Sequence, residues 1–295
     1  PMGLLQGKVA GLNISRQGSD PTSTGYNIQI RGFSTLGKGT GSSPLYVVDG
    51  IPTDNIDNIA PEEIASMDVL KDGSAAAIYG TRGTNGVILI TTKRAKQDGG
   101  QECAKTNVEY NGYVSVAAPY TNTGFATPEE YRNLAEISNG TVAANIQPGG
   151  YNTDWMAAAM KAAAVTTAHN VAVSGAGKAF SYRGSVNYKY AEGLALNTDR
   201  QEIIAKFAAD QQALQGWLKL QYDFSYMHYR NNYDCGDFKQ AATLNPTYPI
   251  YDEKNTTSGY FIPSGSGQSN PIAATNQKES YQVGNFFRGS VKATI

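Results

Sequence analysis

Long stretches of alternating residues are the feature of this sequence that most constrains its fold. Across residues 180–191 the even positions are aromatic, aliphatic or glycine, and the odd positions are polar or charged. Such alternation predicts a β-strand with one apolar face and one polar face. Strands of soluble sandwiches usually have about five or six residues, whereas a tilted membrane-spanning strand needs about 9–11. The length of this stretch therefore favours a strand that crosses a membrane.

The same pattern recurs along the second part of the chain. Residues 106–117, 215–229 and 281–295 alternate clearly, and residues 167–174 and 200–209 do so more weakly. The pattern predicts about six antiparallel strands, with the polar face toward a wet lumen and the aromatic face toward lipid.

The links between these stretches also alternate in length. Those at residues 175–178 and 210–214 are tight, residues 119–166 and 230–280 are long, and residues 192–199 are intermediate. Short turns at one end and long loops at the other are typical of an outer-membrane barrel with its long loops outside the cell. The first long loop also predicts a helix, with Thr127 as N-cap and Pro128 at its first position.

Residues 1–97 have a different composition, rich in glycine with short apolar runs. Short strands are expected at residues 27–31, 45–48 and 87–91, a short helix from Pro61, and a helical turn at 74–79. A polar, glycine-containing linker at residues 96–102 separates this α+β module from the alternating stretches. The chain is thus predicted to contain one domain at 1–97 and a second at 98–295.

Charge and cysteine content exclude several classes of protein. Lys and Arg total 24 against 25 Asp and Glu, so the net charge of −1 lacks the basic footprint of a nucleic-acid binder. The opening residues lack the basic region of a secretory signal peptide, as expected for a mature or truncated chain. Cys103 and Cys235 are too few for a disulfide scaffold, and whether they pair stays open.

Four segments of the first domain carry a family resemblance. LQGKVAGLNIS at 5–15, IQIRGFSTL at 28–36, PLYVVDGIP at 44–52 and IAPEEIASMDVLKDGSAAAIYGTRGTNGVILITTK at 59–93 occur in this order. Together they resemble the plug domain of TonB-dependent outer-membrane transporters, most of all the SusC/RagA branch of Bacteroidetes.

The second domain resembles the start of the same family's barrel. TDW at 153–155, AHNVAVSGAG at 168–177, NPTYPIYD at 245–252 and NPIAA at 270–274 carry this likeness. The expected fold is an α+β plug domain followed by antiparallel transmembrane strands, part of a barrel of about 22 strands.

The resemblance implies a transporter of the bacterial outer membrane rather than an enzyme. Such a protein imports oligosaccharides, or less often peptides, beneath a SusD-like surface lipoprotein. The TonB–ExbB–ExbD complex supplies the energy, and outer-membrane lipid surrounds the barrel. A siderophore or cobalamin receptor and a glycan-binding module that transports nothing are the alternatives.

The resemblance also suggests which residues seat the plug. Arg31 and Arg82, in the IRG and TRG motifs, are expected to meet barrel glutamates, a role favoured over substrate contact. Asp49, Asp68 and Lys71 belong either to the same polar seam or to a solvated face.

Substrate contacts are expected at the extracellular side. An apical plug loop offers Phe33, Ser34, Thr35 and Lys38. The long loops offer aromatic rings that stack on sugars or pack peptides: Tyr120, Tyr151, Trp155, Tyr233, Tyr248 and Tyr251. Packing of these loops against one another is the alternative role for each ring.

Catalytic and metal-binding patterns are missing from the sequence. His169 and His228 are isolated, no carboxylate–histidine cluster has ligand spacing, and no Gly-x-Ser-x-Gly elbow occurs. Glycine-rich residues 37–42 do not match the spacing of a phosphate-binding loop. We therefore predict no catalytic residues, metal or cofactor.

Overall fold

The structure is a computed structural model of the 295-residue chain. It describes most of the sequence, with gaps: residues 7, 9, 12–16, 20–21, 26–30, 43–71, 78–83, 85–95, 105–120, 127, 129–133, 151–234, 236–263 and 268–295.

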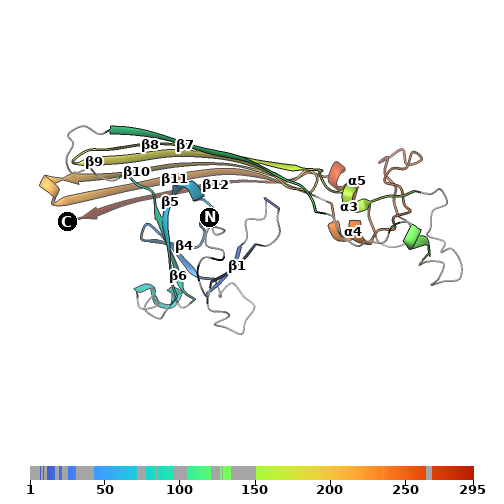
Figure 1. The fold of residues 1–295 in the computed structure, drawn as a ribbon, viewed down its shortest axis with the longest axis horizontal. Helices are drawn as coiled ribbons and strands as arrows, with labels where there is room; N and C mark the ends of the chain where they lie inside the picture. Colours follow the sequence, from blue (N-terminus) through green and yellow to red (C-terminus); the bar gives the residue numbers. More distant parts are fainter. Residues whose placement is uncertain are drawn as a thin grey trace.

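Six long strands form one antiparallel sheet. They are β7 (Lys105–Ala117), β8 (Ala164–Ala176), β9 (Phe180–Glu192), β10 (Asp199–Ala213), β11 (Leu218–Tyr233) and β12 (Ser280–Thr294). They pair in simple chain order, β12-β11-β10-β9-β8-β7, and form the curved upper layer in Figure 1. All six predicted strands are present, with 13 to 16 residues each.

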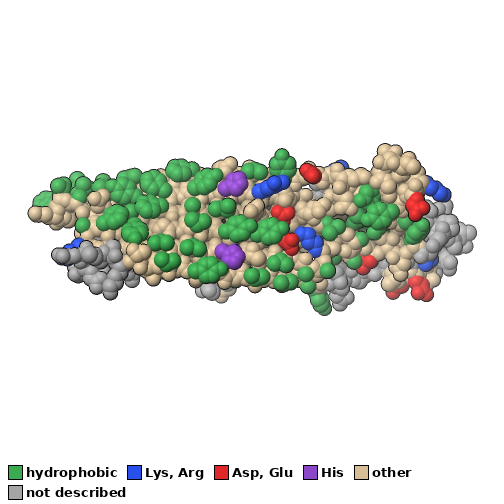
Figure 2. Space-filling view, turned by 90° about the horizontal axis from the view of Figure 1, so that it is seen from above, with side chains coloured by type: hydrophobic (Ala, Val, Ile, Leu, Met, Phe, Trp, Pro, Cys, Tyr) green, Lys and Arg blue, Asp and Glu red, His purple; other side chains and the backbone are tan. Residues whose placement is uncertain are grey.

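The two faces of this sheet differ as the alternation predicts. Residues of the aromatic and aliphatic series, such as Val108, Val186 and Phe224, are exposed on the convex face. Hydrophobic side chains cover much of that face in Figure 2. The polar series, including Arg183 and Asn187, is buried on the concave face, which faces the smaller N-terminal sheets in Figure 1.

The N-terminal part holds two small sheets beneath the long strands. β1 (Leu12–Arg16) pairs with β2 (Tyr26–Ile30). The second sheet, in the order β4-β3-β6-β5, contains β3 (Leu45–Val48), β4 (Ile51–Thr53), β5 (Ile64–Leu70) and β6 (Val87–Thr92). Only the β3–β6 pairing is parallel. Ile14, Ile28, Ile88 and Ile90 join the two sheets in one hydrophobic core.

The short helix predicted to start at Pro61 is a single 3₁₀ turn, η3 (Pro61–Glu63), and the residues after it form a strand instead of continuing the helix. The chain enters β5 at Ile64, and β5 pairs with β6. Ile64 and Met67 still pack on the core, but from a strand. Sheet pairing therefore overrode a local helix signal made only of a proline and two acids. Residues 72–77 lie outside the described part, and η4 (Gly80–Gly83) comes after them.

The ends of the long sheet carry different connections. Short turns, one of them η5 (Leu214–Gly216), lie at one end, and the long loops lie at the other. These loops contain α3 (Trp155–Ala158), α4 (Phe238–Thr243) and α5 (Pro271–Gln277), each capped by an Asp or Asn side chain. The predicted cap at Thr127 is confirmed, since its Oγ1 accepts a bond from the backbone N–H of Glu130 at 3.2 Å.

The helices of the described segments are all too short or too polar to cross a membrane.

Candidate functional site

The interface between the N-terminal sheets and the long sheet is the most polar buried region of the described structure. Its centre is Glu63, which η3 presents to β9. Both carboxylate oxygens of Glu63 accept bonds from Arg183, at 3.1 and 3.2 Å. Glu109 of β7 contacts the same guanidinium at 3.2 Å. The Arg183 and Glu63 side chains are 6% and 3% exposed, so this is a buried ion pair.

The neighbouring acid of η3 extends the contact along β9. Asn187 donates its Nδ2 hydrogen to Glu62 at 3.3 Å. Arg183 and Asn187 are separated by four positions and point to the same face, because side chains alternate along a strand. One turn of η3 thus places two carboxylates opposite two polar residues of a single strand.

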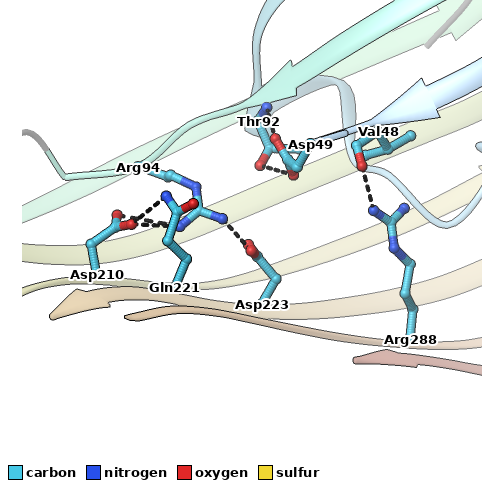
Figure 3. Close-up of polar contacts among 8 residues, drawn as sticks. All are labelled: Val48, Asp49, Thr92, Arg94, Asp210, Gln221, Asp223 and Arg288. Carbon is cyan, nitrogen blue, oxygen red and sulfur yellow. Dashed lines mark hydrogen bonds and ion pairs between the residues drawn. The ribbon is translucent and has the colours of Figure 1, made fainter. Parts of the chain in front are cut away.

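A second ionic cluster lies just after β6 (Figure 3). Arg94 donates to both oxygens of Asp210 on β10 at 3.2 Å and also pairs with Asp223 on β11. Gln221 donates to Asp210 at 2.7 Å. Burial disfavours the charged guanidinium, but Asp223 and Asp210 outweigh this, so the pKa of Arg94 is raised. The arginine is therefore always charged, and the cluster is held by charge-assisted bonds.

The β3–β4 turn forms the third contact with the long sheet. Asp49 and Gly50 both have positive φ, as a tight hairpin turn requires. The Asp49 carboxylate accepts bonds from the backbone N–H and the hydroxyl of Thr92, at 2.9 and 2.7 Å. Arg288 of β12 donates to the carbonyl oxygen of Val48 at 2.9 Å (Figure 3). The turn is thus fixed internally by Asp49 and reached from the sheet by Arg288.

Between these contacts lies a small cavity of about 30 Å³. Lys206 of β10 and Asn58 line it, and the Lys206 Nζ and Asn58 Oδ1 atoms are buried without a hydrogen-bond partner among the described residues. A cavity of this size is large enough for water, and these buried polar atoms are partners that a water could bond. The only buried apolar cluster that bridges the two parts, within the described chain, is small: Ala60, Ile204 and Met227.

The structure describes four of the five predicted seating residues, and their surroundings differ. Arg31 is outside the described residues. Arg82 is 3.4 Å from Asp54 of the same N-terminal part, with side chains 64% and 87% exposed. Asp68 is exposed and Lys71 is half-buried, whereas Asp49 lines the interface cavity.

The expected arrangement, in which an arginine of the N-terminal part pairs with acids of the long sheet, is present at Arg94. In the Glu63–Arg183 pair the charges are reversed, because the N-terminal part supplies the acid and the long sheet supplies the arginine. Sequence reasoning missed both pairs, although Arg183 and Asp223 stood in the polar series of their predicted strands, which was the available signal.

The predicted substrate residues separate into buried and exposed groups. Phe33, Ser34, Thr35 and Lys38 lie outside the described residues. Tyr120, Tyr151 and Tyr251 are exposed, at 92%, 49% and 61%. The Tyr233 hydroxyl donates to Gln282 at 2.7 Å.

Trp155 and Tyr248 are buried and do not offer a ring face to a solute. They belong to the loop cluster, defined here as six residues packed together: Trp155, Ala159, Ala241, Leu244, Tyr248 and Ile272. The indole of Trp155 donates to the Asn245 carbonyl at 3.1 Å. For these two rings, packing between the long loops is the role that the structure supports.

Trp155→Ala should loosen the loop cluster without unfolding the strands. Removing a buried tryptophan costs about 3–5 kcal/mol, so amides of residues 238–250 should exchange hydrogen faster in the intact protein. Tyr151→Ala, which truncates a half-exposed ring beside it, is the matched control and should leave exchange unchanged. Equal exchange in wild type and Trp155→Ala would show that the cluster does not hold the loops.

Comparison with known proteins agrees with this geometry. Residues 2–87 match the family model of the TonB-dependent receptor plug domain. The TonB-dependent receptor SusC of Bacteroides thetaiotaomicron is 31% identical over 98% of this chain. This chain belongs to the SusC-like TonB-dependent receptors. The N-terminal sheets are accordingly its plug, and the long strands are part of its barrel wall.

Other similar proteins agree on the family and the fold. The TonB-dependent receptor P26 of Formosa agariphila is 32% identical over 97% of the chain. The RagAB peptide importer in its open-open state superposes over the whole chain with a TM-score of 0.77 at 23% identity. The chain spans 31% of SusC, 29% of P26 and 37% of the RagAB chain. The family consists of transporters rather than enzymes.

Among the residues that the structure places, no group of three or more His, Cys, Asp or Glu side chains is arranged to hold a metal ion. In the ionic clusters, Glu63 pairs with Arg183 of the barrel wall, and Asp210 and Asp223 pair with Arg94 of the plug. Glu109 pairs with the same Arg183 within the barrel wall.

Proposed function

We propose that the intact receptor imports oligosaccharides or peptides across the outer membrane. In this proposal a SusD-like lipoprotein covers the extracellular end, and the TonB–ExbB–ExbD complex pulls on the plug. The likeness to SusC supports the family role, and the likeness to RagAB is consistent with a peptide as the alternative cargo.

The observation that carries the proposal is the ionic attachment of the plug. The plug keeps its own hydrophobic core, with Val47, Ile88 and Ile90 almost completely buried. Its contact with the barrel rests mainly on Glu63–Arg183 and on Arg94 with its two aspartates.

Ionic attachment suits a part that must be released and seated again. A buried ion pair gains little net energy because desolvation opposes the Coulomb attraction. When the pair separates into a wet lumen, both charges regain water. A plug held in this way can move without exposing a large apolar surface, whereas an apolar interface would resist separation and invite aggregation.

Uptake by cells that produce the full-length receptor tests the proposal. We expect labelled oligosaccharides or peptides to accumulate, and accumulation to stop when the proton gradient is collapsed or the TonB protein is deleted. Co-purification of a SusD-like lipoprotein would separate this function from siderophore or cobalamin import. Binding of glycan without any gradient-dependent uptake would overturn the transport proposal.

A further inference from the structure

The convex face of the barrel wall changes from apolar to charged along its length. Outward residues of β11, taken every second position, are Phe224, Tyr226, His228, Arg230 and Asn232. In Figure 2, hydrophobic side chains cover the turn end and middle of this face, and histidine and charged side chains come next toward the loops. A lipid boundary produces this order, because aromatic and polar side chains gather where hydrocarbon meets headgroups.

An apolar groove of about 490 Å³ lies on this face, nearer to the short turns than to the long loops. Val173, Gly184 and Ala205 line it on one side, and Phe224 and Phe287 on the other. The groove exists partly because Gly184 has no side chain: a Cβ there would meet only Phe207, at 4.0 Å. In a membrane, a hollow of this kind fits a lipid acyl chain.

A polar pocket of about 330 Å³ lies on β10 to β12, closer to the long loops than the groove is. Arg230 and Lys278 line it and are exposed, and neither forms an ion pair within the described residues. Asp199 and Glu279 also line it, and Asp199 accepts two bonds from Asn232, at 3.0 and 2.9 Å. The pocket therefore places two cations beside two carboxylates and several amide and hydroxyl groups. The cations suit a phosphate, and the remaining groups suit the hydroxyls of a sugar.

Polar and aromatic side chains of β11 and β12 lie between the groove and the pocket. The Tyr226 hydroxyl, at the upper edge of the groove, donates to Asn285 at 2.8 Å. His228 contacts the same Asn285 oxygen, also at 2.8 Å. Arg230 lies further along the same strand face, with its guanidinium over the Tyr281 ring at 5.3 Å. A single ligand with an apolar tail and a phosphate-bearing head would thus meet a continuous surface.

We propose that β10 to β12 hold a phosphorylated glycolipid of the outer leaflet. Its phosphate binds Arg230 and Lys278, its sugar hydroxyls meet the pocket's amides, and an acyl chain lies in the groove beside Gly184. This inference rests on the proposed function only in taking the convex face as lipid-exposed.

Lipid binding by the purified full-length receptor tests this site. The probes are a bisphosphorylated diglucosamine lipid, the same lipid after dephosphorylation, and phosphatidylcholine, each in mixed micelles. Wild type should bind the phosphorylated lipid at least tenfold more tightly than the other two. The double variant Arg230→Gln/Lys278→Gln should lose this preference.

Two further variants separate the site from general effects. Gly184→Leu places a side chain in the groove, where its Cβ would meet only Phe207 at 4.0 Å, and should weaken binding of both glycolipids. Lys254→Gln removes an exposed cation that does not line the pocket, and it should change nothing. Heat-dependent gel mobility checks that each barrel is folded.

Several outcomes would overturn the site. They are unchanged binding by the double variant, equal binding of the dephosphorylated lipid, and an equal loss in Lys254→Gln. Lost uptake with intact lipid selectivity would count against the proposed function alone, and intact uptake without selectivity would count against this site alone.

Discussion

Arg183→Gln should release the plug from the barrel wall more than any other single substitution. It leaves Glu63 buried without its partner, and Glu109, which contacts the same guanidinium, also loses its cation. Removing one member of a buried pair costs about 3–5 kcal/mol, and the upper end applies here because the Arg183 and Glu63 side chains are only 6% and 3% exposed. Since each 1.4 kcal/mol is a factor of ten, plug opening should become about a few thousandfold more frequent.

Hydrogen exchange in β5 and β6 of the full-length receptor measures this opening. Arg82→Gln is the matched control: its pair with Asp54 is exposed, and exposed pairs are worth about 0–1 kcal/mol. Glu63→Gln/Arg183→Gln should recover much of the loss, because no unpaired charge then remains buried between η3 and β9. If Arg183→Gln exchanges no faster than Arg82→Gln, the ion pair does not hold the plug.

The barrel strands were predictable because their signal is local and repeated. Residues 180–191 were predicted as a strand, and β9 runs from Phe180 to Glu192. An alternation of two residues also assigns each side chain to a face. The apolar series was therefore expected on one side, and Val186 is indeed exposed on the convex face.

The partners across the interface were not predictable from the same pattern. Glu63 and Arg183 are 120 positions apart, and their contact depends on how η3 lies against β9. Arg183 stood in the polar series, but that series shows only which residues face inward. Motif likeness pointed instead to Arg82, which contacts Asp54. The three-dimensional arrangement was therefore needed to identify which residues pair. The sequence pattern alone was enough to predict that the interface is wet and polar.

The predictions for the short elements of the plug failed for a related reason. Pro61 and the two acids after it favour a helix start, yet β5 begins at Ile64 because β6 offers a pairing edge. The Asp49–Gly50 dipeptide between apolar residues is a hairpin signal that the strand prediction at 45–48 left out. Short elements depend on their neighbours more than long alternating strands do.

Arg94→Gln should weaken the second attachment, with an effect in the same range of about 3–5 kcal/mol. Asp210 and Asp223 lie on adjacent strands, with side chains 12% and 16% exposed, and without Arg94 they repel each other. The triple variant Arg94→Gln/Asp210→Asn/Asp223→Asn removes the repulsion and should restore most of the stability. Exchange at residues 87–95 measures the change, and Lys93→Gln, which alters a neighbouring cation, is the control.

The two attachments should also break in a definite order under force. Glu63 lies about thirty positions nearer the N-terminus than Arg94, which directly precedes the segment leading into the barrel. Tension applied at the N-terminus therefore reaches Glu63–Arg183 first and Arg94 last. In single-molecule pulling on the full-length receptor, Arg183→Gln should lower the force of an early step, and Arg94→Gln only that of a later one. If both variants lower the same step, the plug leaves the barrel as one rigid body, and its attachments do not yield in sequence.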